Sequence, residues 1–91
     1  MVGLVKVLAV ELGSQGIRAN AILPGGIDTA AYRSHSPTAE ARSFVEGLHA
    51  LKRVGRPDEL AHSVVYLASD ASKFTTGTAF LVDGGVSINR T

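Results

Sequence analysis

Residues 20–29, with the sequence Asn-Ala-Ile-Leu-Pro-Gly-Gly-Ile-Asp-Thr, constrain the fold of this chain more than any other segment. An apolar run is ended here by a Pro-Gly-Gly break, and an acid and a hydroxyl follow. Because proline ends a strand ladder, residues 17–23 are predicted to form a strand. A buried strand of this kind delivers a close-approach loop to the carboxyl edge of a parallel sheet, where α/β proteins bind ligands. The segment therefore predicts an α/β fold with a binding loop.

Apolar residues at helical spacing predict a helix over residues 2–12. Leu4, Leu8 and Leu12 share one face, and Gly13 is predicted to end the helix. The valines coat most of the remaining surface, and a helix that is apolar nearly all round needs cover on both sides.

A long connection follows the Pro-Gly-Gly break and runs to Arg56. Ser36 is predicted as the N-cap, and Pro37 as the first residue, of a helix in this connection. That helix is expected to carry three apolar residues, Phe44, Leu48 and Leu51. A connection of this length with its own helix is more often a functional flap than a neutral link.

A further helix and a second strand complete the chain. Pro57 is predicted to open a helix with acidic residues in its first turn. The buried stripe of that helix is expected to consist of Leu60, Val64 and Leu67. Residues 78–82 form the second predicted strand, which ends at Asp-Gly-Gly (83–85). Strand–helix–strand order at this spacing predicts parallel pairing.

Length and composition narrow the classes of protein that this chain represents. Ninety-one residues set one small domain as the ceiling, and a net charge of +1 gives no reason to expect nucleic acid or a membrane surface as a partner. The absence of cysteine excludes disulfides and thiolate chemistry and favours a reducing compartment. Lys6 and Glu11 interrupt the opening apolar stretch, so it does not read as a signal peptide. We therefore expect a cytoplasmic protein.

Two parallel strands do not make a self-sufficient sheet, because parallel sheets are covered on both faces and usually contain more strands. The strand at residues 17–23 is therefore expected to have an open side. By this count, the chain represents part of a domain.

Six short blocks occur in a characteristic order along the chain. They are Val-Glu-Leu-Gly (10–13), Ile-Arg-Ala-Asn (17–20), Pro-Gly-Gly-Ile-Asp-Thr (24–29), Arg-Val-Gly-Arg-Pro-Asp-Glu-Leu (53–60), Leu-Ala-Ser-Asp (67–70) and Thr-Gly-Thr…Val-Asp-Gly-Gly (76–85). Together they closely resemble the C-terminal part of the short-chain dehydrogenases/reductases, Rossmann-fold oxidoreductases that use NAD or NADP. The resemblance covers essentially the whole chain.

The resemblance implies the C-terminal portion of a Rossmann-type doubly wound parallel sheet, incomplete as a stand-alone fold. Residues 1–13 correspond to an interface helix, and residues 17–29 to a strand with the nicotinamide loop. Residues 30–56 correspond to the variable substrate flap, and residues 57–91 to the last helix, the last strand and the tail. The first helix and the last helix and strand resemble the assembly surfaces of the family, which implies a homo-oligomer.

The resemblance also assigns a cofactor-binding role to four positions. Pro24 and Gly25 look like the pair that lies against the nicotinamide ring, and the backbone of Ile27 like the position that bonds the carboxamide. Thr29 looks like the hydroxyl that holds the carboxamide or the pyrophosphate. From the residues alone, the glycine pair could simply supply positive φ in a turn, and Thr29 could equally be a helix N-cap. Asp28 is interpreted as a capping or turn acid.

The family's catalytic pair, Tyr-x-x-x-Lys, has no counterpart here. Four residues after Tyr32 stands Ser36, and four residues after Tyr66 stands Asp70. The Gly-rich pyrophosphate loop is also missing, so no catalytic residue is assigned. The sequence of residues 1–4 resembles the stretch that follows the catalytic lysine in family members.

These observations lead to three hypotheses. The first is the C-terminal segment of an NAD(P)-dependent alcohol or ketone oxidoreductase, inactive alone, whose small-molecule substrate binds the intact enzyme. The second is a non-enzymatic truncated paralogue beginning at Met1, which acts as an assembly module with itself or a full-length relative. The third is a proteolytic or cloning fragment of an intact enzyme.

The remaining polar residues are assigned mostly structural roles. The three histidines show no metal-ligand spacing, and we expect them at the surface, with two of them able to touch substrate from the flap. They are His35 and His49, in the flap, and His62. The basic cluster of Lys52, Arg53 and Arg56 is interpreted as a solvated helix entry, with a phosphate-bearing ligand as the weaker alternative. Arg18 and Asn20 are expected to be structural.

Overall fold

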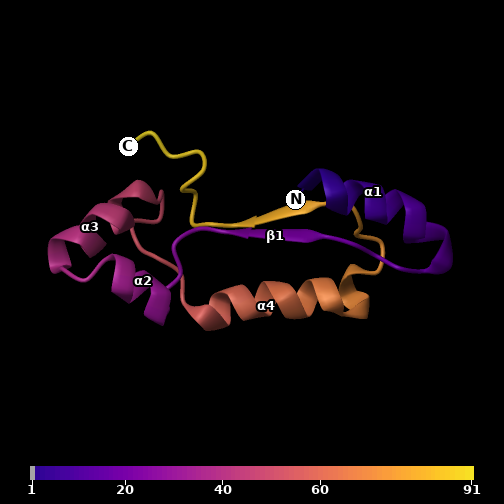
Figure 1. The fold of residues 1–91 in the computed structure, drawn as a ribbon, viewed down its shortest axis with the longest axis horizontal. Coiled ribbons are helices and arrows are strands. Elements are labelled where there is room, and N and C mark those ends of the chain that lie inside the picture. Colours follow the sequence, from indigo (N-terminus) through magenta and orange to yellow (C-terminus); the bar gives the residue numbers. More distant parts are fainter. Residues whose placement is uncertain (1) are drawn as a thin grey trace. The chain divides into compact units, whose positions relative to one another are not determined.

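A computed structural model describes residues 2–91, and Met1 lies outside the described residues. The helices and strands are α1 (Val2–Leu12), β1 (Ala21–Pro24), α2 (Ala30–His35), α3 (Ala39–Leu48), α4 (Pro57–Ala68) and β2 (Ala79–Val82) (Figure 1). Short 3₁₀ turns occupy Gly13–Gln15 and Asp70–Ser72. The chain divides into a first unit, residues 2–23 with 62–81, and a second unit, residues 24–61 with 82–91.

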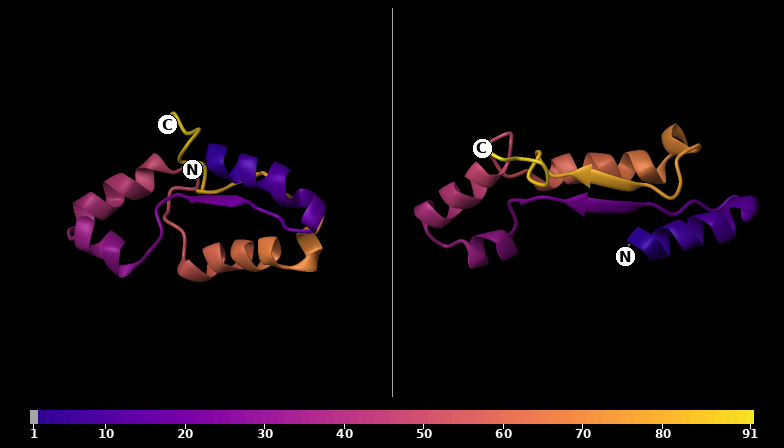
Figure 2. Two further views of the ribbon diagram at one scale, coloured as in Figure 1. Left: turned by 45° about the vertical axis from the view of Figure 1, so that its right-hand side comes forward. Right: turned by 90° about the horizontal axis from the view of Figure 1, so that it is seen from above.

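Strands β1 and β2 form a parallel two-stranded sheet, and their arrows point the same way in Figure 2. The N–H of Ala21 donates to the carbonyl of Thr78 at 2.9 Å, and the N–H of Gly77 donates to that of Ala19 at 2.7 Å. The parallel pairing is confirmed, but β1 begins later than the predicted strand at residues 17–23. The preceding residues bond instead to a turn, where the N–H of Ala19 meets the hydroxyl of Thr76 at 3.1 Å.

In the first unit, α1 and residues 62–68 of α4 lie on opposite faces of the strands (Figures 1 and 2). The predicted helix over residues 2–12 is confirmed. The α-helix ends at Leu12, directly before Gly13 as predicted, but the chain continues through a 3₁₀ turn. The left-handed residue that stops it is Gly16, with φ 75°.

Few apolar side chains of the described residues are buried. The buried ones are Ala9 and Ala21. The predicted buried stripe of α4 is wrong at Val64, which is 48% exposed, and Val10 of α1 is 85% exposed. Large apolar faces without cover are typical of surfaces that pack against other protein.

The second unit holds two flap helices rather than the one predicted. Thr29 caps α2 and Thr38 caps α3, since each hydroxyl accepts an N–H three residues later. Ser36 is therefore not an N-cap: it follows the last residue of α2. Leu51 lies beyond the end of α3. The last helix begins at Pro57, as predicted.

Candidate functional site

The Pro-Gly-Gly loop lies in the second unit and is held by backbone contacts. The N–H of Gly25 donates to the carbonyl of Val82 at 3.1 Å. A Cβ atom added at Gly25 would lie 2.8 Å from the Cα and carbonyl oxygen of Asp83, and one added at Gly26 would lie 2.9 Å from Cγ1 of Val54. Neither glycine has positive φ. Glycine is required at these two positions because other segments of the same chain lie close to them, and not because the backbone forms a left-handed turn.

Ile27 forms an isolated parallel bridge with Gly55. The bridge consists of two hydrogen bonds of 2.8 Å. The Gly55 N–H donates to the Gly26 carbonyl, and the Asp28 N–H donates to the Gly55 carbonyl. In a parallel bridge of this register, the two flanking residues, here Gly26 and Asp28, supply the carbonyl and the N–H, and the residue between them supplies neither. The main-chain N–H and C=O of Ile27 therefore stay outside the bridge, while the residues on both sides of it are fixed.

Thr29 and Asp28 have separate partners. The Thr29 hydroxyl accepts the Tyr32 N–H at 3.2 Å, which confirms that Thr29 is an N-cap. Because a hydroxyl has one donor in addition to its lone pairs, its proton stays available for an outside acceptor. Nε of Arg33 donates a hydrogen bond to Oδ1 of Asp28 at 2.9 Å, and this bond holds the pKa of Asp28 below its usual value. Asp28 thus pairs with an arginine side chain, and Thr29 rather than Asp28 caps α2.

His49 contradicts the expectation of a surface histidine, since only 2% of it is exposed. It follows the last residue of α3, and its Nε2 lies 3.0 Å from the main-chain nitrogen of Gly26. Its Nδ1 lies 2.9 Å from the carbonyl oxygen of Val45. Sequence spacing carries no signal for this role, because both partners are main-chain groups.

The acid at the exit of β2 behaves as predicted. The Asp83 carboxylate accepts the N–H groups of Gly85 at 2.9 Å and of Ser87 at 3.3 Å. The Ser87 side chain is the leading cause that lowers the pKa of Asp83, and the Gly85 N–H is the second. Gly84 and Gly85 have φ of 56° and 85°, so the exit turn requires glycine.

The basic cluster before α4 is solvated and its arginines are paired, which confirms the structural interpretation. Arg53 makes two bonds to the Glu59 carboxylate, at 2.7 and 2.9 Å. These bonds, with the N–H of Arg56, lower the pKa of Glu59 to about 2. Arg56 itself pairs with Asp58 at 2.8 Å. Each arginine of this cluster thus faces a carboxylate.

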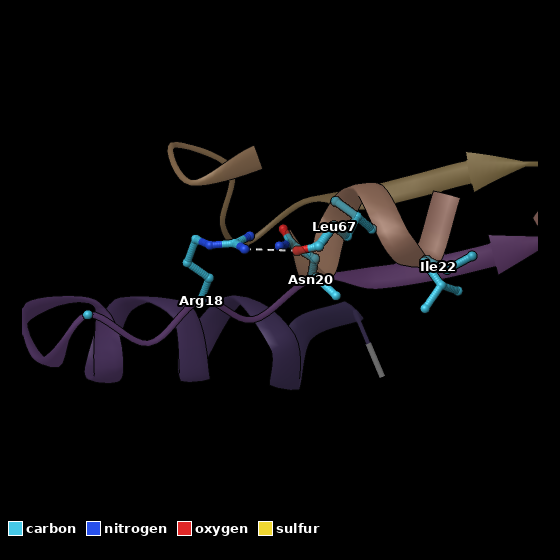
Figure 3. Close-up of a pocket in the computed structure, with 7 residues that line it drawn as sticks. Arg18, Asn20, Ile22 and Leu67 are labelled. Carbon is cyan, nitrogen blue, oxygen red and sulfur yellow. Dashed lines mark hydrogen bonds between the residues drawn. The ribbon is translucent and has the colours of Figure 1, made fainter. Parts of the chain in front are cut away.

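A hollow of about 480 Å³ lies in the first unit, and Figure 3 shows Arg18, Asn20, Ile22 and Leu67 on its wall. The Arg18 guanidinium donates to three carbonyls, those of Leu67, Ser69 and Thr75, at 2.9 to 3.2 Å. The Asn20 side chain donates to the Thr75 carbonyl and accepts the Thr78 N–H, both at 3.1 Å. The structural roles predicted for Arg18 and Asn20 are confirmed, and the polar groups of this wall are engaged within the chain.

The other histidines are exposed, and Nδ1 of His35 lies 2.8 Å from the Ala31 carbonyl. Within residues 2–91, no group of three histidines or acids is placed to hold a metal ion. In the same part of the chain, no helix has the length and apolar character needed to cross a bilayer.

The sequence is similar to a family profile and to proteins of known activity. The sequence profile described as enoyl-(acyl carrier protein) reductase matches residues 1–87. The chain is 42% identical over 86 residues to an L-rhamnose 1-dehydrogenase (NAD(P)(+)) of Sphingomonas sp. (strain SKA58), covering 94% of this chain and 34% of that relative. It is 40% identical over 87 residues to a 3-oxoacyl-[acyl-carrier-protein] reductase of Chlamydia trachomatis. This match covers 96% of this chain and 34% of that relative.

The structure is also similar to solved structures. It superposes on a 4-hydroxyisoleucine dehydrogenase complexed with NADH with a TM-score of 0.90 and 34% identity, covering 98% of this chain and 37% of that chain. The chain thus spans about a third of the length of the proteins that it matches. The expected portion of a Rossmann-type parallel sheet is confirmed.

Proposed function

The chain belongs to the short-chain dehydrogenase/reductase family, and on this premise we propose that it supplies the nicotinamide wall of an NAD(P)-dependent oxidoreductase. The bound cofactor would exchange a hydride with the carbon of an alcohol or ketone. This chain would hold one side of the nicotinamide ring and, through residues 30–56, cover the substrate. Residues 1–13 and 57–91 would supply assembly surfaces.

The observation that carries this proposal is the main chain of Ile27. Its N–H and C=O stand outside the bridge to Gly55, while the bonds on both sides of it fix the backbone. A nicotinamide carboxamide has one C=O and one NH₂, which complement this pair. Pro24 and Gly25 precede Ile27 in the chain and carry no long side chain. The Thr29 hydroxyl retains its proton for a carboxamide or pyrophosphate oxygen. The residues present therefore fit the cofactor.

Proton transfer would come from protein outside these 91 residues, because neither tyrosine has a lysine four residues later. We expect no turnover from the chain alone and weak or no NAD(P) binding. The relatives act on substrates as different as L-rhamnose and 3-oxoacyl groups, by their names, so the proposal stops at the alcohol or ketone class.

A chimera tests the proposal. The matched third of the Sphingomonas L-rhamnose 1-dehydrogenase is replaced by this chain, and NAD(P)-dependent oxidation of L-rhamnose and NADH binding are measured. We expect cofactor binding and turnover by the chimera and none by the chain alone. An Ile27→Pro chimera lacks the proposed carboxamide donor but keeps both bonds of the bridge, so its KM for NAD(P) should rise. A folded chimera that does not bind NADH, or an Ile27→Pro variant that binds as well as its parent, would contradict the proposal.

A second function is favoured by the apolar surface of α1, where Leu4 is 58%, Val7 52% and Val10 85% exposed. The chain would then be a non-enzymatic assembly module that covers this face with a second copy or with a full-length relative. Sedimentation of the chain over a range of concentrations tests self-association. The Val10→Glu variant should dissociate a dimer formed through α1, and a monomer at every concentration would argue against self-assembly.

A further inference from the structure

The His49 imidazole joins two segments that are distant in the chain. On one side lies the carbonyl of Val45, one turn earlier in α3, and on the other lies the main-chain nitrogen of Gly26. The side chain is buried, so water does not compete for either bond. The flap helix α3 is thereby tied to the loop that carries Ile27.

The partners fix the protonation state of this imidazole. A carbonyl oxygen only accepts hydrogen bonds, so Nδ1 must carry a proton to bond Val45. An amide N–H only donates, so Nε2 must present a lone pair to Gly26. Both bonds form together only in the neutral imidazole protonated at Nδ1.

The glycines around the ring leave room for it and for little else. A Cβ atom at Gly25 would lie 3.0 Å from Nε2, one at Gly26 3.2 Å from Cε1, and one at Gly84 3.4 Å from Cδ2. The ring therefore contacts bare backbone of the loop and of the turn after β2. A shift of the imidazole is transmitted to the loop backbone, because no flexible side chain lies between them.

We propose that neutral His49 is a positioning residue that latches residues 24–27 to α3, and that protonation of its imidazole releases this loop. The inference rests on the proposed function for the meaning of the loop, since the latch would hold Ile27 ready for the carboxamide. In the protonated ring, Nε2–H faces the Gly26 N–H, and two donors cannot share a bond. The released loop would no longer present Ile27 in a fixed orientation.

The charged groups near the ring belong to the turn after β2, to α3 and to the segment before α4. Asp83, in the turn after β2, is close enough that the imidazole contributes to lowering the pKa of that carboxyl. Glu46 on α3 is a second acid nearby in the chain, whereas Arg53 is engaged by Glu59. Residues 24–27 carry no ionisable side chain.

Nuclear magnetic resonance of the ¹⁵N-labelled chain tests the latch without any cofactor. We expect a scalar coupling across the hydrogen bond between the Gly26 nitrogen and Nε2 of His49. As the pH is lowered through the titration of the His49 ring, the coupling should disappear and the Gly26 amide should titrate with the same midpoint as the ring. A Gly26 amide that does not follow the ring, or an absent coupling at neutral pH, overturns the proposal.

Two near-isosteric variants separate the latch from simple packing. The Oε1 of His49→Gln reaches about as far as Nε2 and can accept the Gly26 N–H at every pH. The amide nitrogen of His49→Asn can only replace Nδ1, so the bond to Gly26 is lost. We expect Gly26 to stay protected from hydrogen exchange in the Gln variant and to lose about tenfold protection in the Asn variant. Equal protection in the two variants overturns the latch.

His35 provides the matched control. Its Nδ1 bonds the carbonyl four residues earlier, as that of His49 does, but the ring is exposed. His35→Asn should leave the Gly26 amide unchanged. If the Asn variant of His49 does not fold, the coupling and the shared midpoint in the unaltered chain decide the question. Failure of the proposed function would appear only in NADH binding by the chimera, so the two failures are distinguishable.

Discussion

The Cα atom of Asp83 would lie 2.8 Å from a Cβ atom added at Gly25. The Pro-Gly-Gly loop and the turn after β2 therefore approach each other through backbone alone. Neither side has a flexible side chain that could move aside. This contact gives Gly25 a role in packing within the chain that is independent of any ligand, and it predicts that the position tolerates no larger residue.

We expect Gly25→Ala to lower the free energy of unfolding by about 1–3 kcal/mol, the usual cost of overpacking. Urea titration in the presence of trimethylamine oxide, which keeps weakened variants folded at the start, measures the change. The control is Gly47→Ala in α3, where an added Cβ meets nothing within 4 Å. That variant should gain up to about 1 kcal/mol from helix propensity. Equal effects at the two glycines would contradict this account.

Lys52 has φ 57°, in the left-handed region that residues with a Cβ atom adopt at a cost. We expect Lys52→Gly to stabilise the chain by about 0.5–1 kcal/mol, after the larger entropy of the unfolded glycine is subtracted.

Lys52→Ala is the matched control for this position. It keeps the Cβ atom and removes only the exposed bond from Nζ to the Gly47 carbonyl. Its unfolding midpoint in urea should stay close to that of the parent chain. If the alanine variant is more stable than the glycine variant, backbone strain at Lys52 is not significant.

The parts of the fold that could be predicted from sequence are those encoded locally. The helix at residues 2–12, the start of α4 at Pro57 and the acid at Asp83 follow from spacing, a fixed proline φ and a turn carboxylate. The flap was harder to predict, because Ser36 and Thr38 stand on either side of Pro37 and either could serve as a helix N-cap. Such choices depend on what each hydroxyl can reach in three dimensions.

The part of the site that could not be predicted depends on contacts between distant residues. His49 gives no signal in sequence, since its partners are main-chain atoms of Val45 and Gly26. The burial of Val64 was also predicted wrongly, because periodicity indicates which face is apolar and not whether anything covers it. The sequence places Pro24 at the end of β1 and Gly25, Ile27 and Thr29 in the segment that follows, and the cofactor roles of all four stay predictions.

Arg18 should be difficult to replace, because its planar guanidinium donates at once to three carbonyls between the end of α4 and Thr75. Lysine keeps the charge but not the fork of donors. We expect Arg18→Lys to lower the free energy of unfolding by about 2 kcal/mol, the scale of hydrogen bonds from a charged donor. Arg42→Lys is the control, since the Nε of Arg42 makes a single bond to the Ser36 carbonyl. Urea titration should show a clearly smaller loss there.

The lowered pKa of Glu59 predicts how the free energy of unfolding depends on pH. Its pKa falls from 4.5 to about 2 in the folded chain, first through the bond with Arg53 and then through the Arg56 N–H. A carboxyl with a lowered folded pKa stabilises the fold above its unfolded pKa, and this contribution is lost as the pH falls towards the folded value. The stabilisation should therefore be complete above about pH 5 and vanish near about pH 2.

Glu59→Gln isolates this contribution, because the amide oxygen can still accept the Arg56 N–H but carries no charge. Asp28 and Asp83 also have lowered pKa values, and they titrate equally in both proteins, so their effects cancel in the difference. Unfolding free energies measured between about pH 5 and about pH 2 should show the parent chain losing its advantage over the variant as acid is added. A difference that stays constant across this range would mean that the Arg53–Glu59 pair is too well screened by solvent to stabilise the fold.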